Sequence, residues 1–179
     1  IDQPLVITQR PGSSDYIVHS GGNTRLLVLK DLYEETGDDR FSRVQCLFKP
    51  WNRESDVLLA HLRENDLRGS LSFIDKARAV FDIKQLLEKE LDIKELSQRR
   101  LGMAMHAGGY ALSQGLISPM GYAVNRLLPL IPQALNAGLG KPQVQKIRAL
   151  DNAAFQLWGR HGLGDKAAFD EVFAALCRR

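Results

Sequence analysis

The hydrophobic positions follow two patterns, and the change falls about a third of the way along the chain. Short apolar runs at residues 4–8 and 16–20 flank a turn rich in Pro, Gly and Ser, which is typical of two adjacent strands. Residues 23–36 place apolar side chains every three to four positions, and Gly37 follows as a stop. A third strand-like run covers residues 43–51. Strand, glycine turn, helix and strand together predict a small α/β unit.

From Ser55 onward the pattern is helical throughout. Ser55, Ser72, Ser97 and Asp165 are expected as N-caps, and Pro142 suits the first position of a helix. Because Asp75 stands three positions after Ser72, that start is close to a capping box. The chain is therefore expected to be an α+β protein.

The division between the two patterns predicts two modules. The boundary is expected near residues 65–71, with a mixed domain over 1–68 and a helical domain over 69–179. The chain begins at Ile1 rather than Met and ends on "LCRR", so we expect a segment of a longer protein.

Composition narrows the class of protein. With 44% hydrophobic and 25% charged residues, 179 residues are enough to bury a core. Cys46 and Cys177 form no metal-ligand spacing, and no apolar run approaches the ~18 residues of a membrane span. The four histidines share no ligand spacing and are expected to be structural or exposed. We expect a cytoplasmic protein that does not enter a membrane.

Charge is distributed unevenly. Residues 1–60 carry seven basic and nine acidic side chains, whereas residues 61–179 carry 17 and 12. The segment 96–150 holds six Lys or Arg residues and no Asp or Glu. A surface without carboxylates does not repel a polyanion, so this segment is expected to bind nucleic acid.

The turn "SGGNTR" at residues 20–25 has two interpretations. Gly21 and Gly22 would let an anion approach the backbone at a helix N-terminus, and Arg25 would add a bidentate contact. Alternatively, the glycines only make the turn, and Asn23 or Thr24 caps the helix.

A second polar stretch, "ENDLR", places Glu64, Asn65 and Arg68 where the two modules meet. A carboxylate and an amide there could bind Mg²⁺ that bridges a triphosphate, because Mg²⁺ prefers hard oxygen ligands. The alternative is the solvated end of a helix.

Taken together, these stretches resemble the ParB family of partition proteins. That family has a glycine turn after a strand, then a Glu-Asn-x-x-Arg box, then a helix-turn-helix domain. The form "SGGNTR" followed by "ETGDDRFSRVQCLFKPW" is most similar to the ParB-like branch of integrative conjugative elements. The resemblance implies a ParB/sulfiredoxin-like α/β unit followed by an all-helical helix-turn-helix domain.

The resemblance also implies a function. In the family these motifs bind CTP with Mg²⁺, and nucleotide binding closes a dimeric clamp on double-stranded DNA. It implies a homodimer associated with the nucleoid, possible contact with a partition ATPase, and a role in partition or maintenance of a chromosome, plasmid or integrative conjugative element. The implied nucleotide site consists of Gly21, Gly22, Asn23, Thr24, Arg25, Glu64, Asn65 and Arg68, with Glu64 and Asn65 near the metal.

Two departures from the family pattern bear on activity. Asn23 and Thr24 replace the usual Glu-Arg pair, so CTP binding is expected more than slow CTP hydrolysis. The family's earlier arginine-containing box is not recognisable in residues 1–10.

Other members of the fold class are weighed against this assignment. Sulfiredoxins carry a cysteine nucleophile in a Gly-Gly-Cys-His-Arg turn, and Asn23 at that place excludes their chemistry. A nuclease of the same fold would need metal-binding carboxylates, whereas the acids here resemble a solvated surface. A helix-turn-helix transcriptional regulator without nucleotide binding is the third alternative. The acidic residues weighed as ligands for the nuclease alternative are Asp15, Asp31, Glu34, Glu35, Asp38 and Asp39.

The acid-free segment coincides with the helix-turn-helix that the resemblance implies near residues 97–128. Its first helix would be 97–107, with Gly108 and Gly109 in the turn. Pro119 implies either a kinked second helix or one that begins at Ser118, because proline disfavours a helix interior. The candidate base readers are Ser113, Gln114 and Ser118, and the candidate phosphate contacts are Arg99, Arg100, Arg126, Lys141 and Lys146.

Overall fold

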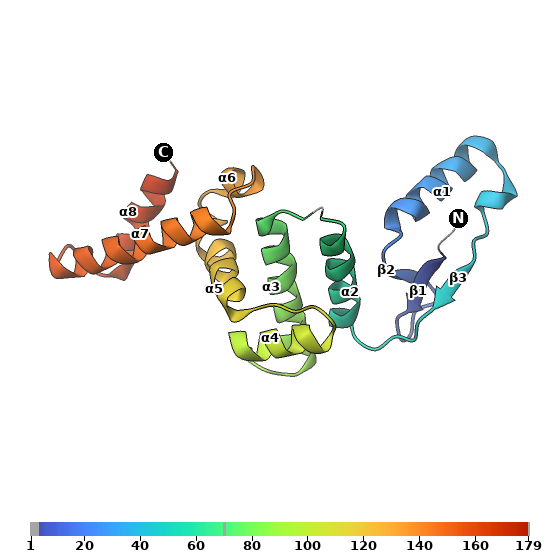
Figure 1. Ribbon diagram of the computed structural model, residues 1–179, viewed down its shortest axis with the longest axis horizontal. Coiled ribbons are helices and arrows are strands. Elements are labelled where there is room, and N and C mark those ends of the chain that lie inside the picture. Colours follow the sequence, from blue (N-terminus) through green and yellow to red (C-terminus); the bar gives the residue numbers. More distant parts are fainter. Residues whose placement is uncertain (1–3, 70, 179) are drawn as a thin grey trace.

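The computed structural model describes residues 4–69 and 71–178, in which a small mixed sheet is followed by a series of helices (Figure 1). The sheet lies near the N-terminus and the last two helices lie at the opposite end of an elongated molecule. The α+β class expected from the hydrophobic pattern is confirmed. In the described part of the chain, no helix combines the length and apolar character needed to cross a membrane.

The sheet has the strand order β2-β1-β3. β1 (Leu5–Gln9) pairs antiparallel with β2 (Tyr16–Ser20) and parallel with β3 (Cys46–Phe48). All three strands were predicted from short apolar runs, although β3 is shorter than the run at 43–51. The parallel pairing requires a crossover between β2 and β3, which α1 provides.

Helix α1 (Asn23–Thr36) connects the end of β2 to a short 3-10 turn (Asp39–Phe41) before β3. It ends at Gly37, whose φ of 63° and backbone bond to the Tyr33 carbonyl complete the expected stop. Leu29 is buried against the rest of the unit.

Helix α2 (Glu54–Leu67) begins earlier than expected, and the prediction of Ser55 as its N-cap is wrong. Arg53 is the N-cap, and Ser55 is 2% exposed. Its backbone N–H and its hydroxyl both donate to the Glu90 carboxylate of α3 (Phe73–Glu90). Ser55 therefore joins two helices instead of starting one.

Helix α2 contacts both the sheet and the other helices. His61 Nε2 lies 3.2 Å from the Val18 carbonyl of β2, whereas Leu59 and Leu62 belong to the helical core. The predicted division after residue 68 stays a prediction, because α2 is shared between the two sides. The largest fully buried side chains in the core include Ile74, Ile83, Leu101, Met105, Ile117, Met120, Leu127 and Leu135.

The starts of α3 and α4 (Gln98–Ala107) are confirmed. Ser72 accepts from the Asp75 N–H at 3.2 Å, and Ser97 accepts from the Arg100 N–H at 3.3 Å. Both serines stand in extended backbone just before their helices, as side-chain caps require.

Helix α5 (Gln114–Tyr122) contains Pro119 in its interior, and a π-helical turn (Ala123–Leu127) follows at once. The alternative in which the helix begins at Ser118 is therefore wrong. Proline cannot donate to the carbonyl four residues before it, so regular α-helical hydrogen bonding is interrupted here. Pro119 is itself buried, so packing favours this arrangement.

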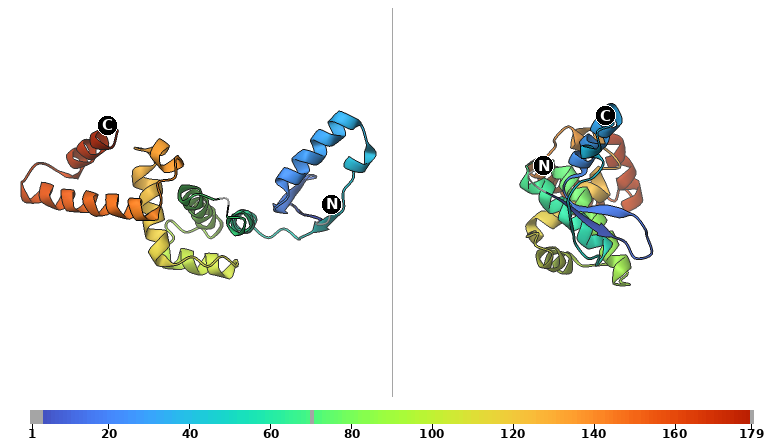
Figure 2. Two further views of the ribbon diagram at one scale, coloured as in Figure 1. Left: turned by 45° about the horizontal axis from the view of Figure 1, so that its top comes forward. Right: turned by 90° about the vertical axis from the view of Figure 1, so that its right-hand side faces the viewer.

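The remaining helices are α6 (Pro132–Asn136), α7 (Lys141–Arg160) and α8 (Lys166–Cys177). Asp165 caps α8 by accepting from the Ala168 N–H, as predicted. Pro142 lies in the first turn of α7, one position later than predicted, because the helix begins at Lys141. The α7–α8 pair extends away from the core (Figure 2). Phe169 fills its centre, with ring contacts to Phe155, Trp158 and Phe173.

Candidate functional site

The glycine turn lies where β2 passes into α1. Gly21 has φ 49° and Gly22 has φ 97°, both in the left-handed region that favours glycine. Gly22 is the N-cap and contributes no side-chain bond, so the interpretation of Asn23 or Thr24 as the N-cap is wrong. Both residues stand exposed in the first turn of α1, which carries no acidic side chain.

The second polar stretch meets this turn in space. A Cβ added to Gly21 would overlap the carboxylate of Glu64, which lies more than 40 residues later in the chain. A Cβ added to Gly22 would press on Leu5 and come within 3.3 Å of the Arg25 guanidinium. The structure therefore brings Gly21, Gly22, Arg25 and Glu64 to one place.

Glu64 is held there by an ion pair with Arg68, one helical turn later on α2. Its carboxylate is 26% exposed, so it remains reachable from solvent. Asn65 is the next residue of α2 and is exposed. Every residue of the implied nucleotide site thus lies on the glycine turn, the first turn of α1 or the end of α2.

This arrangement fits a bound phosphate only together with a cation. Left-handed glycines and the start of α1 favour an anion, whereas the Glu64 carboxylate against Gly21 repels one. Two anions side by side require a cation between them, and Mg²⁺ with oxygen ligands meets that requirement. Glu64 and Asn65 are the oxygen-bearing side chains that would hold it.

The acidic residues considered for a nuclease are spread over the surface of the α/β unit. Asp38 accepts from the backbone and side chain of Arg40, which lowers the pKa of its carboxyl. Within residues 4–69 and 71–178, no group of three or more His, Cys, Asp or Glu side chains gathers as metal ligands would.

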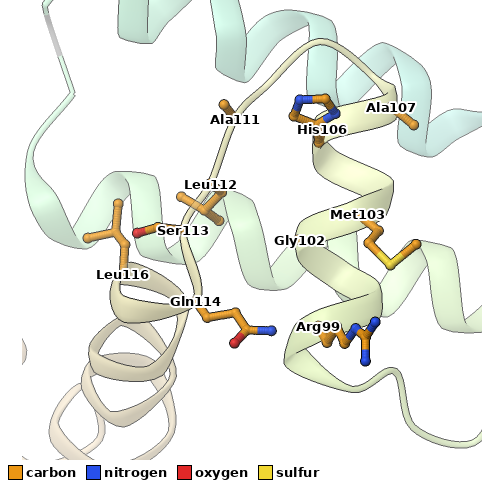
Figure 3. Close-up of a pocket in the computed structure, with 10 residues that line it drawn as sticks. All are labelled: Arg99, Gly102, Met103, His106, Ala107, Ala111, Leu112, Ser113, Gln114 and Leu116. Carbon is orange, nitrogen blue, oxygen red and sulfur yellow. The ribbon is translucent and has the colours of Figure 1, made fainter.

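The segment predicted to form a helix-turn-helix has an open hollow of about 740 Å³ between α4 and α5 (Figure 3). Arg99 and Gln114 lie at the same end of this hollow, whereas the hydroxyl of Ser113, the N-cap of α5, points away from them. All three side chains are exposed. The structure thus groups three of the predicted DNA contacts around one opening.

Other predicted DNA contacts lie elsewhere. Arg100 is exposed in the first turn of α4, Lys146 is exposed on α7, and Lys141 is half-buried at the start of α7. Ser118 accepts a hydrogen bond from Arg148 Nη1 at 2.7 Å, which turns its hydroxyl toward α7.

Arg126 is held inside the protein. Its guanidinium pairs with Asp151 at 3.3 Å and with Asp170 at 2.7 Å, and it lies 4.6 Å from the centre of the Phe173 ring. Tyr122 donates to the same Asp151 carboxylate, and burial together with that carboxylate raises the pKa of Tyr122. Arg126 stands in the segment that lacks acidic residues, but its charge is neutralised by carboxylates from α7 and α8.

Protein-family models, curated proteins and solved structures give no match to this chain. The ParB resemblance accordingly rests on the chain's own motifs.

One connection at the site has no signal in the sequence. Tyr110, in the turn between α4 and α5, donates to Asp66 of α2 at 2.8 Å, and Lys76 of α3 pairs with the same carboxylate. Burial would raise the pKa of Asp66, but the hydrogen bonds from Lys76 and Tyr110 outweigh it and lower that pKa. The helix end that carries Glu64 is thereby connected to the turn between α4 and α5.

Proposed function

We propose that this chain is a ParB-like DNA-binding protein whose α/β unit responds to CTP and Mg²⁺. It would act as a homodimer on double-stranded DNA, in the cytoplasm and associated with the nucleoid. The role would be partition or maintenance of a chromosome, plasmid or integrative conjugative element, in conjunction with a partition ATPase.

The observation that carries the proposal is the position of the Glu64 carboxylate against Gly21. The two motifs of the resemblance are more than 40 residues apart in sequence, yet their side chains and backbone meet. If the similarity to the two motifs arose by chance, there would be no reason for the two stretches to lie in contact.

In this proposal Gly21, Gly22, Thr24 and Arg25 hold the phosphates, and Glu64 and Asn65 hold Mg²⁺. Bound nucleotide would supply negative charge that the glycine turn and Arg25 neutralise. Because Arg68 pairs with Glu64, it would keep that carboxylate oriented when the cation is present. Asn23 and Thr24 replace the family's Glu-Arg pair, so CTP binding is proposed ahead of slow CTP hydrolysis.

The coupling between nucleotide and DNA would run through α2. Its C-terminal end carries Glu64 and Asp66, and Asp66 accepts from Tyr110 in the helix-turn-helix turn. A shift at Glu64 on nucleotide binding would therefore reach the turn that positions Ser113 and Gln114.

Selection of bound DNA from a random duplex pool, with and without CTP and Mg²⁺, tests the whole proposal. A recovered sequence motif whose retention changes with CTP is the expected result. A motif that is indifferent to CTP would instead support a regulator without nucleotide binding. Metal-dependent nicking of plasmid DNA would support the nuclease.

Thermal unfolding tests the nucleotide site separately. CTP with Mg²⁺ should raise Tm, whereas CTP without a divalent ion should not, because Glu64 repels the phosphates. Arg25→Ala should abolish the rise. Glu64→Gln should allow some binding without Mg²⁺, and a Tm that never responds to CTP would refute nucleotide sensing.

A further inference from the structure

A second group of cationic side chains lies away from both proposed surfaces, in a pocket of about 210 Å³. The pocket is formed by the end of β2, the connection from β3 to α2, α2 itself and the residue after α4. We call it the junction pocket. Its polar and glycine lining includes His19, Lys49, Arg53, Asp56, Arg63 and Gly108.

His19 is the buried member of this lining. It is 4% exposed, and its Nδ1 has no hydrogen-bond partner among the described residues. Burial and then the nearby Lys49 lower the pKa of His19, so the imidazole is neutral at pH 7. Burying an unpaired ring nitrogen is unfavourable, and such groups often face a ligand or water.

The charges around His19 do not balance. Asp56 is the carboxylate of the pocket, and Asn52 and Arg53 engage its two oxygens. Lys49 and Arg63 have no carboxylate within ion-pair distance in the described parts of the chain, and both help to lower the pKa of His19. The pocket therefore holds two uncompensated positive charges.

The neighbouring His61 does not supply the missing partner. Its Nε2 is directed to the Val18 carbonyl at 3.2 Å, and its charge would further lower the pKa of His19. The groups that face His19 from the surrounding elements are thus Lys49, Arg53, Asp56, His61 and Arg63.

The junction pocket is separate from the DNA-facing hollow. The two spaces are lined by different residues, although Ala107 of the hollow immediately precedes Gly108 of the junction pocket. It also differs from the glycine turn, where Glu64 is the residue of α2 that faces Gly21.

From these observations we propose that the junction pocket binds a phosphate-sized oxyanion, with Lys49 and Arg63 as its charged contacts. The buried His19 ring lies beside them, and a small rotation of the ring would bring its unpartnered Nδ1 within reach as a hydrogen-bond donor. A neutral imidazole can place its proton on either nitrogen, so Nδ1–H can donate. The volume is several times the roughly 30 Å³ that one water occupies, which is enough for a phosphate group.

The bound anion would connect the two halves of the molecule. His19 and Lys49 come from the α/β unit, Arg63 comes from α2, and the Arg63 guanidinium also lies against Gly109, where an added Cβ would be 2.8 Å away. Occupancy would therefore restrain the β-sheet relative to the helix-turn-helix turn.

Inorganic phosphate is the first probe, added to the whole protein at constant ionic strength. Tm should rise with phosphate concentration and reach a plateau. Arg63→Gln and Lys49→Gln should each weaken the apparent phosphate affinity by about tenfold or more, the loss of a charge-assisted contact. Both side chains are exposed, so the variants should fold. Lys94→Gln, an exposed lysine between α3 and α4, is the matched control and should respond as the parent does.

The imidazole resonances of His19 provide a direct reading in the unaltered protein. Phosphate should shift them and raise the pKa of His19, because an anion beside the ring offsets Lys49 and Arg63. His161, exposed at the end of α7, is the internal control and should show no such change.

The same resonances distinguish the sources of the phosphate group. A shift with inorganic phosphate alone indicates a free anion. A shift with CTP that persists in Arg25→Ala indicates a nucleotide phosphate, and a shift with duplex DNA indicates a backbone phosphate. Equal Tm responses in Arg63→Gln, Lys49→Gln and the parent, or unchanged His19 resonances with all three probes, would overturn the proposal and leave a pocket that holds water.

Discussion

At the scale of single residues, the conformation of the glycine turn is set by contacts that only a residue without a side chain can make. Gly21 combines a left-handed backbone with direct contact to the Glu64 carboxylate, whereas Gly12 has φ 77° with open space around it. The two glycines therefore differ in packing but share the backbone requirement.

This difference yields a stability prediction. Gly12→Ala should cost about 1 kcal/mol, because an L-residue in left-handed backbone is strained. Gly21→Ala should cost at least about 1 kcal/mol more, since the new Cβ displaces Glu64 from its position. Urea unfolding of both variants measures the difference, and Glu64→Ala should remove the excess. Equal losses would show that Glu64 moves aside freely.

At the scale of elements, two charged side chains connect helices to one another in addition to the hydrophobic packing. Asp66 links α2 to α3 and to the turn before α5, and Arg126 links the π-helical turn to α7 and α8. Each is a charged group with more than one partner, so each fixes an orientation.

Tyr110→Phe tests the first link. The variant loses one hydrogen bond to a carboxylate that is 25% exposed, so we expect a loss of about 1 kcal/mol at pH 7. The pKa of Asp66 is lowered in the fold, so its contribution is present above the ordinary pKa of 3.8 and is lost as pH falls through the folded value. The difference between variant and parent should therefore shrink at low pH, because a neutral partner makes a weaker bond. Tyr33→Phe, on the exposed face of α1, is the control.

Arg126→Ala tests the second link. Removing the cation leaves the Asp151 carboxylate, whose side chain is 10% exposed, without its charged partner, and we expect a loss of about 3 kcal/mol. Lys146→Ala, exposed on α7, should stay within about 0.5 kcal/mol of the parent. Denaturant unfolding gives both values. If Arg126→Ala kept the stability of the parent but bound DNA more weakly, Arg126 would instead be a contact to the DNA phosphates.

At the scale of the whole molecule, the proposed nucleotide site and the proposed DNA surface lie on different elements that α2 connects. Arg99, Ser113 and Gln114 border one hollow, and the glycine turn lies beyond α2 in the α/β unit. In the proposed function, one part of the molecule would bind DNA while another part would respond to a nucleotide.

Arg99→Ala should weaken binding to all DNA sequences and lower the slope of log affinity against log salt by about one, because one phosphate contact is lost. Gln114→Ala should instead relax sequence preference with little change in slope. Arg40→Ala, in the α/β unit, should leave both quantities unchanged. Salt titrations of duplex binding measure all three variants, and affinity that is independent of salt would refute a basic DNA surface.

Local sequence patterns determined much of the fold. Short apolar runs beside a turn located β1 and β2. Capping residues located the starts of α3, α4 and α8, because such interactions join residues three or four positions apart. The glycines of the turn were also evident, since few other residues adopt left-handed backbone.

Only tertiary structure decided which charged groups meet. Ser55 resembles a cap in sequence but is buried against Glu90, and Arg126 stands in a segment without acids but pairs with Asp151 and Asp170. The contact between Glu64 and Gly21 is likewise one that only the tertiary structure shows. These partners lie 25 or more residues away along the chain, so their approach depends on how helices pack and not on any local preference.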